Sequence, residues 1–465
     1  MTSQGREQAL ERMRVAGVSR PARDTFARHY DHLAAGATGL IAEADVEPAL
    51  PTVQLEDVQV DAEQERAALG RTVVLTLNGG LGTSMGLAGP KSLLPVREGL
   101  SFLDITVRQV LALRERHGIP LPLILMDSFS TQDPTLEALA GYPDLAVDDL
   151  PLDFLQSQEP KLRADDLTPV TWEPDPRLEW CPPGHGDLYP SLLASGLLEA
   201  LIEDGYRYAF VSNVDNLGAV PDGRLAAWFA ASGAGYAAEV CPRTEMDKKG
   251  GHLVRRRSDG RLVLRDTAQT AEDEMVHFMD ADTHPYVNTN NLWFDLQRLH
   301  TMLTERGGVL ELPLIRNAKT VDPTDKGSTP VIQIESAMGG AVELFDDAVS
   351  VGVTRERFVP VKTTNELTLL RSDVYRVDDS TYRLSRTVDP APVVDLDKDH
   401  YGMIGDLDAR FPAGVPSLVE ATRFEVQGDW RFGSGVRVVG AARLGPEGGT
   451  VEDGSTLGTP APGQA

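Results

Sequence analysis

The chain has 465 residues, more than a single hydrophobic core usually serves, so its length predicts two or three domains. Its 44 Lys and Arg against 70 Asp and Glu leave a net charge of −26 at pH 7, which argues against broad binding to nucleic acid or to membranes. The sequence has no apolar run that could span a bilayer and no apolar signal-peptide core. Because its two cysteines, Cys181 and Cys241, also fit a reducing compartment, we expect a cytoplasmic protein.

The first part of the chain shows helical and acidic segments. Residues 5–35 place apolar side chains among charges on both sides of Pro21, which predicts two short helices. Acidic residues gather between Ala42 and Arg66, and we interpret that stretch as a solvated linker rather than a binding face.

An alternation of strands and helices begins at Arg71. Residues 71–77 (RTVVLTL) are a continuous apolar and β-branched run, which predicts a strand buried on both faces. The pattern then predicts a helix over 101–118, a strand over 121–128, a helix over 131–142, a helix over 187–205 and a strand over 206–216. This order predicts a parallel sheet with helices on its faces and ligands beyond the carboxyl ends of its strands, where NGG and NVDN stand.

Three other segments have their own character. Residues 143–186 hold eight prolines and many acids, and we interpret this stretch as a functional segment that caps the site. Residues 250–266 predict a hairpin around Ser-Asp-Gly. After about residue 388, short β segments alternate with glycine, which is compatible with a few coils of a parallel β-helix, and residues 459–465 predict a disordered tail.

The loop at 78–92 (NGGLGTSMGLAGPKS) joins the first buried strand to a helix and holds five glycines. Glycine lets backbone N–H groups approach an anion closely, so the loop predicts a phosphate cradle, with Lys91 supplying a positive charge. The spacing of Gly80, Gly82 and Gly86 does not match a dinucleotide fingerprint, and Pro90 interrupts a Walker A pattern. The loop therefore predicts a nucleotide site of another kind.

With Leu77 before it, this loop resembles the signature of the eukaryotic-type UTP:glucose-1-phosphate uridylyltransferases, or UDP-glucose pyrophosphorylases. The likeness recurs in order at 123–135, 182–198, 210–219, 249–253, 287–294, 333–345 and 357–370. The resemblance implies a Rossmann-like nucleotidyltransferase (GT-A-like) mixed α/β sheet flanked by helices, with a small C-terminal left-handed parallel β-helix domain. We expect an N-terminal segment over 1–66, a catalytic domain over 67–387 and the β-helix domain over 388–465.

The resemblance implies attack of a sugar-1-phosphate oxygen on the α-phosphorus of UTP, giving UDP-glucose and pyrophosphate. The attacking phosphate is already a nucleophile, so catalysis must come from alignment and charge neutralisation. By this resemblance Lys91 and Lys362 neutralise phosphate charge, and Asp215 holds Mg²⁺, which takes few protein carboxylates.

The resemblance also assigns substrate contacts. The UTP contacts are Leu77, Asn78, Gly79, Gly80, Lys91, Gln156, Gly184 and Asn213, with Gln156 and Gly184 at the uracil. The sugar-phosphate contacts are His185, Asn213, Asn290, Asn288 and Lys362, with Asn291 as support. Asp187 is interpreted as a helix N-cap, Cys181 as an inert thiol, and Glu335 has no assigned role.

Other functions stay open beside glucose. The same chemistry could use galactose 1-phosphate or N-acetylglucosamine 1-phosphate, although the NGG start of the loop favours glucose. A non-catalytic nucleotide-sugar-binding protein would have lost Lys91, Asp215 or Lys362, and all three are present. A dehydrogenase fails on the glycine spacing and on the missing ribose acid. The chain could be a monomer or a homo-oligomer assembled through the C-terminal domain.

Overall fold

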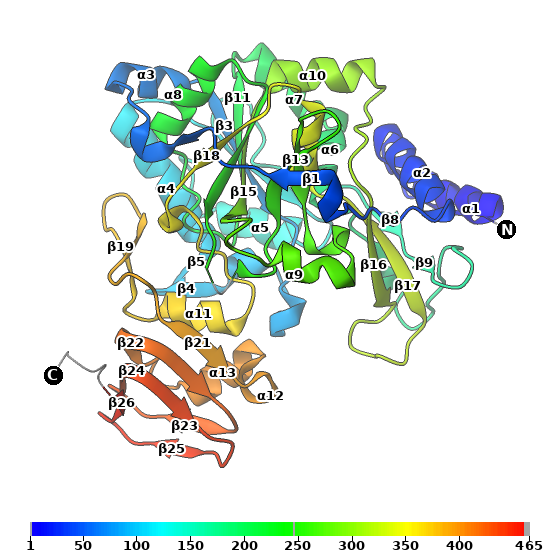
Figure 1. The fold of residues 1–465 in the computed structure, drawn as a ribbon. Helices are drawn as coiled ribbons and strands as arrows, with labels where there is room; N and C mark the ends of the chain where they lie inside the picture. Colours follow the sequence, from blue (N-terminus) through cyan, green and yellow to red (C-terminus); the bar gives the residue numbers. More distant parts are fainter. Residues whose placement is uncertain (1, 245–246, 460–465) are drawn as a thin grey trace.

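The fold is taken from a computed structural model, which describes residues 2–244 and 247–459 (Figure 1). Its α-helices are α1 (Thr2–Val15), α2 (Arg20–Ala34), α3 (Ala62–Leu69), α4 (Phe102–His117), α5 (Gln132–Leu139), α6 (Leu188–Ala194), α7 (Leu197–Glu203), α8 (Gly223–Ser232), α9 (Met275–Phe278), α10 (Leu296–Glu305), α11 (Thr364–Arg371), α12 (Lys398–Tyr401) and α13 (Ile404–Arg410). Within the described ranges, no helix combines the length and the apolar character that crossing a membrane requires.

The centre of the molecule is an eight-stranded mixed sheet in the order β2-β18-β12-β15-β11-β3-β6-β7. Its strands are β2 (Val53–Gln54), β3 (Thr72–Asn78), β6 (Leu123–Asp127), β7 (Asp153–Leu155), β11 (Tyr208–Asn213), β12 (Tyr236–Pro242), β15 (Tyr286–Asp295) and β18 (Val349–Gly352). Neighbouring strands run parallel except at β15, which is antiparallel to both β11 and β12. The mixed sheet flanked by helices is therefore confirmed.

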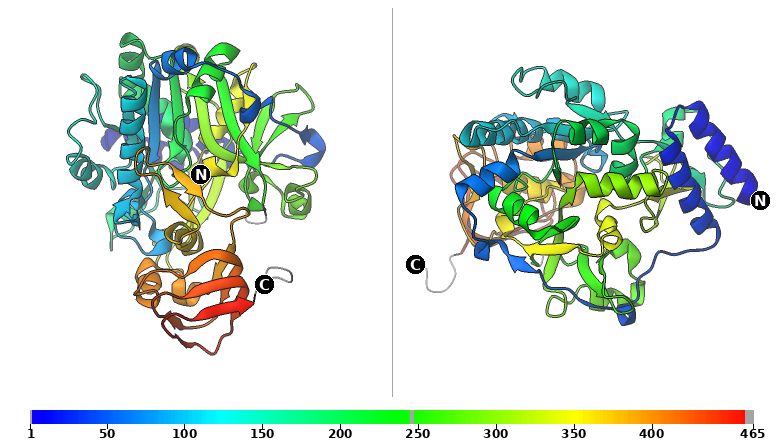
Figure 2. Two further views of the ribbon diagram at one scale, coloured as in Figure 1. Left: turned by 90° about the vertical axis from the view of Figure 1, so that its left-hand side faces the viewer. Right: turned by 90° about the horizontal axis from the view of Figure 1, so that it is seen from above.

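Helices cover both faces of this sheet, because its central strands are apolar on both sides. All seven residues of β3 and all five of β6 are buried. Val74 packs in one hydrophobic cluster with residues of α3, α4 and α8, whereas Val73 and Leu75 pack in another with residues of α6, α7 and α10 (Figure 2). The alternating side chains of one strand thus hold the two helical layers together.

Most predicted elements are present, including α1 and α2 around Pro21 and the 250–266 hairpin, formed by β13 (His252–Arg256) and β14 (Leu262–Arg265). The single helix expected over 187–205 is wrong, because the chain forms α6 and α7 with a break at Gly196. Gly196 has a φ of 75°, in the left-handed region, which interrupts a right-handed helix.

The interpretation of 42–66 as a solvated linker is also wrong. The segment contributes β1 (Val46–Pro48), which pairs with β13, then β2 at the edge of the central sheet, and the start of α3. Val46, Leu55 and Val58 are buried. A few apolar side chains among the acids are enough to anchor a segment that its charge alone would leave in solvent.

The proline-rich stretch 143–186 folds into short strands rather than a free loop. It holds β7, β8 (Glu159–Pro160), β9 (Leu162–Arg163) and β10 (Trp180–Cys181). β8 pairs with β10, and β9 pairs with β17 (Pro330–Glu335), which pairs in turn with β16 (Ile315–Thr320). Two further hairpins join β4 (Pro95–Arg97) to β5 (Leu100–Ser101) and β19 (Tyr375–Val377) to β20 (Leu384–Arg386).

The C-terminal strands form a separate stack below the main body (Figure 2). The larger sheet has the order β21 (Val393–Leu396), β22 (Ser417–Val426), β24 (Arg437–Leu444) and β26 (Thr456–Thr459), and β23 (Trp430–Phe432) pairs with β25 (Gly449–Val451). All of these pairings are parallel. The predicted tail lies outside the described residues except for Thr459, which ends β26.

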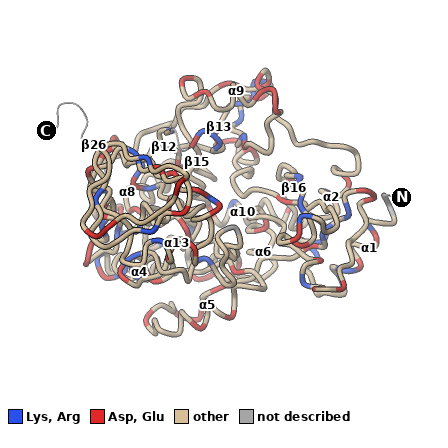
Figure 3. The backbone as a smooth tube through the Cα atoms, turned by 90° about the horizontal axis from the view of Figure 1, so that it is seen from below, with Lys and Arg blue, Asp and Glu red and all other residues tan. Residues whose placement is uncertain are grey.

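Charge is dispersed over the molecule. Seen from below in Figure 3, acidic and basic positions are interspersed along helices, strands and loops. The net charge of −26 is therefore a sum over many elements and does not prevent a local anion site.

Candidate functional site

A cavity of about 720 Å³ lies beyond the carboxyl ends of the central strands, between the sheet and the segment that leads to the C-terminal stack. Six residues predicted for the site line it: His185, Asn213, Asp215, Asn288, Asn290 and Lys362. Its opposite wall comes from residues 389–394 and Thr422. The structure thus brings together residues from four distant parts of the sequence.

Lys91 reaches this group through Asp215, which follows β11. The Nζ atom of Lys91 lies 2.5 Å from Oδ2 of Asp215 and also donates a hydrogen bond to the carbonyl of Val361. The backbone N–H of Val361 donates back to the Asp215 carbonyl at 3.1 Å. These bonds hold the two cations and the carboxylate predicted from the sequence at one place.

Lys362 sits at the rim of the cavity, just before α11. Among the described residues it makes no hydrogen bond or ion pair, and its side chain is exposed. The helix start beside it is capped by Thr363 and Glu366, which form a capping box. The ammonium group is therefore free to meet an anion that enters the cavity.

Amide side chains supply the uncharged polar groups of the cavity. Asn290 has a φ of 62°, in the left-handed region, and its Nδ2 donates to Oδ1 of Asn213 at 3.1 Å. The Oδ1 atom of Asn288 is buried and has no partner among the described residues, so it is available to a ligand. Asn291 bonds Glu239 and Asn216 instead, so its side chain is used within the protein.

A buried ion pair beneath the cavity was not found from the sequence. Glu239 on β12 and Arg357 are both buried and make two hydrogen bonds, at 2.7 and 2.8 Å. Trp293 and Asn291 also donate to the Glu239 carboxylate. The only local signal is a glutamate inside the apolar run YAAEVCP, which requires a buried partner somewhere in the chain.

The glycine loop starts where β3 ends, and it does not line the 720 Å³ cavity. The Nδ2 group of Asn78 donates to Asp127 at 2.7 Å and to Thr135 at 2.9 Å, while its Oδ1 atom is buried and has no partner among the described residues. A Cβ added to Gly79 would lie 2.5 Å from Nε2 of Gln156, whereas Gly80 has open space around it. The loop and the predicted uracil amide are therefore in direct contact.

Asp127, missed by the sequence reasoning, organises this loop from below. It ends β6, opposite Asn78 in the register, and burial raises its pKa to about 6. Its carbonyl accepts the backbone N–H of Gln156 at 2.8 Å. The strand end thus orients both Asn78 and Gln156.

Gly184 and His185 form the turn before α6. A Cβ on Gly184 would lie 2.5 Å from the carbonyl oxygen of Ser336, so only glycine fits there. The Nδ1 atom of His185 accepts the backbone N–H of Met338 at 3.0 Å, and burial lowers the pKa of His185 to about 4. The ring is therefore neutral near pH 7, with its proton on Nε2.

Asp187 occupies the N-cap position of α6, as expected, but its side chain does not cap the helix. Its Oδ2 atom instead accepts from the backbone N–H of Ser157 and from Oγ of Ser191. The reason is competition for the carboxylate. The backbone N–H of Ser157, in a different segment, uses the oxygen that would otherwise accept from the helix backbone.

The remaining predicted residues have structural surroundings. Cys181 is buried, and burial raises the pKa of its thiol, as expected of an inert cysteine. Glu335 on β17 accepts a hydrogen bond from Asn317 at 2.8 Å. Within the described ranges, no group of three or more His, Cys, Asp and Glu side chains could hold a metal ion.

The chain is similar to known proteins over most of its length. The family model for UTP–glucose-1-phosphate uridylyltransferase matches residues 24–438. The enzyme of that name from Solanum tuberosum is 36% identical over 418 residues, which cover 88% of this chain and 85% of the relative. The Saccharomyces cerevisiae relative of the same name is 38% identical over 374 residues, which cover 80% and 73% of the two chains.

Solved structures are similar over nearly the whole chain. The UDP-glucose phosphorylase from Trypanosoma brucei has a TM-score of 0.91 and 42% identity, covering 98% of both chains. A point mutant of the Leishmania major UDP-glucose pyrophosphorylase, solved in complex with UDP-glucose, has a TM-score of 0.91 and 41% identity, covering 98% of this chain and 99% of the other.

Proposed function

We propose that this chain, a member of the UTP–glucose-1-phosphate uridylyltransferase family, transfers the uridylyl group by direct in-line attack. Its reaction makes UDP-glucose from UTP and glucose 1-phosphate. A phosphate oxygen of glucose 1-phosphate forms a bond to the α-phosphorus of UTP. The bond from that phosphorus to the bridging oxygen of the β-phosphate breaks, and pyrophosphate leaves with the electron pair. No proton has to be removed from the nucleophile.

The observation that carries this mechanism is that Asp215 and Lys362 line one cavity together with amide side chains, while Lys91 lies behind Asp215 and is ion-paired with it. Lys91 and Lys362 neutralise the charge that develops on the phosphates, while Asn213, Asn290 and His185 orient the sugar phosphate. The neutral ring of His185 offers its Nε2 hydrogen as a donor.

We propose Mg²⁺ as the cofactor, held by Asp215. One carboxylate fits this ion, because Mg²⁺ keeps several water and phosphate ligands instead of a full protein cage. When bound, Mg²⁺ supplies further charge neutralisation to the phosphates. The Nζ atom of Lys91 donates to Oδ2 of Asp215, so we expect Lys91 to turn from the carboxylate to the phosphates when UTP binds.

We assign UTP to the side of Asp215 that faces the glycine loop, away from the amides that orient the sugar phosphate. The backbone at Leu77, Asn78, Gly79 and Gly80 would hold UTP, and Gln156 with Gly184 would bind the uracil edge. Support comes from the contact of Gln156 with Gly79 and from the lack of room for a side chain at Gly184. Amide and backbone groups match the donors and acceptors of uracil.

The direct test is to mix the purified chain with UTP, glucose 1-phosphate and Mg²⁺ and to measure pyrophosphate release. We expect turnover that stops when EDTA is added and returns with excess Mg²⁺. Galactose 1-phosphate and N-acetylglucosamine 1-phosphate run in parallel decide the sugar. UTP binding without turnover on any of the three sugars would favour a regulatory nucleotide-sugar-binding protein instead.

We also propose a domain organisation. The parallel C-terminal strands are coils of a left-handed β-helix, and the boundaries at 66/67 and 387/388 separate the three parts of the chain. Strand β26 lies at the edge of its sheet, and copies of the chain could associate through it. Light scattering decides between a monomer and a homo-oligomer. The two unpaired cysteines support action in the cytoplasm.

A further inference from the structure

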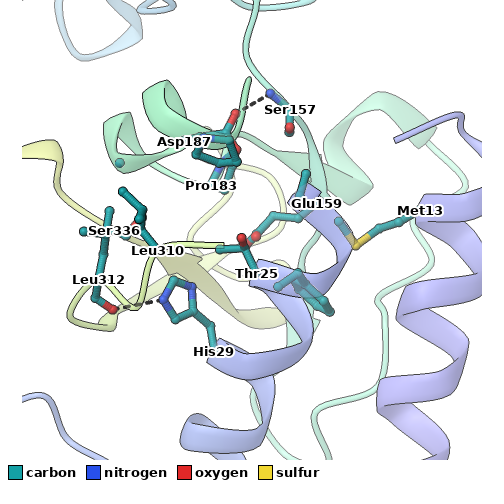
Figure 4. A pocket seen from close by; sticks show the side chains of 14 residues that line it. Met13, Thr25, His29, Ser157, Glu159, Pro183, Asp187, Leu310, Leu312 and Ser336 are labelled. Atoms are coloured by element: carbon teal, nitrogen blue, oxygen red, sulfur yellow. Dashed lines mark hydrogen bonds between the residues drawn. The ribbon is translucent and has the colours of Figure 1, made fainter. Parts of the chain in front are cut away.

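A second, small cavity of about 20 Å³ lies between α2 and the turn before α6 (Figure 4). Its walls include Glu159, Asp187 and His29, with apolar side chains from α1 and α2. Of the described residues that line it, none is Lys or Arg. The carboxylate of Asp187 is therefore balanced by hydrogen bonds rather than by a cation.

Asp187 is the best-connected group of this cavity, and it is only 5% exposed. Its Oδ2 atom accepts the backbone N–H of Ser157 at 2.5 Å, drawn as a dashed line in Figure 4, and the Oγ hydroxyl of Ser191 at 2.6 Å. Hydrogen bonds of this length to a carboxylate are charge-assisted and about twice as strong as neutral ones.

Neither of the titratable neighbours of Asp187 in this cavity, Glu159 and His29, is hydrogen-bonded to its carboxylate. Burial, with the nearby charge of Asp187, raises the pKa of Glu159 well above its ordinary value, which favours the protonated form of Glu159. His29 contacts the carbonyl of Leu312 at 3.1 Å, and burial lowers the pKa of His29. Burial raises the pKa of Asp187 itself to about 6, which leaves it ionised at neutral pH.

The bond to Ser157 crosses between two predicted substrate segments. Ser157 directly follows Gln156, and Asp187 follows Gly184 and His185. The turn that holds Gly184 is anchored without Asp187, because Gly186 donates to the Ser336 carbonyl at 2.8 Å and Ser336 donates to Pro183 at 3.0 Å. Gln156, in contrast, is held between the Asp127 carbonyl on one side and Asp187 on the other.

We propose that Asp187 is a positioning residue that fixes Gln156 at the uracil end of the site, by tying the backbone of Ser157 to the turn that carries Gly184 and His185. This inference rests on the proposed role of Gln156 in binding UTP. It predicts a selective defect, since loss of the Asp187 carboxylate releases the uracil side and leaves the sugar-phosphate side anchored by Ser336.

The test measures steady-state kinetics and calorimetric UTP binding for the full chain and three variants. We expect Asp187→Ala to raise KM and Kd for UTP about tenfold, and Asp187→Asn, a weaker acceptor, about threefold. KM for glucose 1-phosphate and kcat should stay within about threefold. Ser191→Ala removes the hydroxyl that donates to Asp187 and that lies 3.3 Å from the Ser157 hydroxyl, but it keeps the bond from the Ser157 backbone to Asp187, so KM for UTP should stay within about twofold.

Equal increases in both KM values, an equal effect of Ser191→Ala, or an unchanged KM for UTP in Asp187→Ala would overturn the positioning role. If Asp187→Ala does not fold, the threefold change in Asp187→Asn decides the question. If the unmodified chain does not turn over, the proposed reaction fails, and UTP binding by calorimetry still tests Asp187 separately.

Discussion

The central sheet and the C-terminal stack both rely on parallel strands, yet they bury different kinds of side chains. The central part buries ionisable groups such as Asp127, Asp187, Glu239 and Arg357. Among the described residues from 388 onward, no charged side chain is buried, and the hydroxyl of the buried Tyr401 donates to the carbonyl of Trp430. Buried polar groups are costly to hold, so their concentration in one region marks where positioning is needed.

The strands also use their surfaces differently. β3 and β6 are buried on both faces and present their functional groups at their carboxyl ends. β22 and β24 alternate between buried and exposed residues, so one face of each packs inward. A parallel sheet between two helical layers therefore has a site at its strand ends, whereas a stack covered on one face acts as support.

The two regions meet at the glycine loop. Met85 belongs to the same hydrophobic cluster as Tyr401, Leu407 and Phe424 of the C-terminal part. A Cβ added to Gly86 would lie 3.1 Å from Sδ of Met403. The C-terminal stack thus supports the loop that we assign to UTP.

The largest predicted effect concerns charge in the catalytic region. Lys91→Ala and Lys362→Ala should each lower kcat/KM by about 10³-fold, because each removes a cation from the transferring phosphate. Lys398→Ala, at an exposed position of helix α12, makes the same substitution in the C-terminal part and should leave kcat/KM unchanged. A near-normal rate for Lys362→Ala would remove its assignment to phosphate binding.

We also expect the central sheet and the C-terminal stack to unfold together. Leu75→Ala in β3 and Leu418→Ala in β22 each delete a side chain that is 0% exposed and should cost about 3 kcal/mol of unfolding free energy. Because one hydrophobic cluster joins the regions, we expect a single unfolding transition in urea followed by circular dichroism. Two separate transitions, one for each variant, would show that the C-terminal stack folds on its own.

A smaller effect is expected where the regions touch. Gly86→Ala should destabilise the chain by about 1–2 kcal/mol, because Gly86 has a φ of 76° and faces Met403. Gly89→Ala is the matched control, since no atom lies within 4 Å of its added Cβ. Thermal unfolding of both variants would test the contact, and equal changes in the two would contradict it.

The smallest effect concerns buried acid in the catalytic part. The pKa of Glu159 is raised in the folded chain, so the folded state holds a proton that the unfolded state releases above its own lower pKa. The stability linked to Glu159 is therefore present at acid pH and is lost as pH rises.

The side chain in Glu159→Gln cannot ionise. We therefore expect the unfolding free energy of this variant, relative to that of the unmodified chain, to rise by about 1 kcal/mol or more from about pH 5 to about pH 8. Urea unfolding of both proteins at the two pH values measures this difference. A constant difference would mean that Glu159 ionises in the folded chain as it does in the unfolded one.

Local patterns predicted much of the fold correctly. The buried strand at β3, helix α4 with its stop at Gly118, and the β13–β14 hairpin depend on periodicity and on turn residues that are neighbours in sequence. The failures occurred where long-range contacts outweighed a local preference. Residues 42–66 became ordered through pairing with β13 and β18, and Asp187 accepts from a backbone N–H 30 residues away instead of from one in its own helix.

The sequence by itself determined the strand-and-loop framework, because periodicity and turn residues are local, and its resemblance to a family pointed to the six residues that gather at the cavity. Only the tertiary structure decided the pairing of Lys91 with Asp215, 124 residues away, the buried bond of Glu239 with Arg357, and the support of the glycine loop by Met403. Hydrogen bonds and ion pairs act over a few ångströms, so the partner of a side chain is fixed only when folding brings distant segments together.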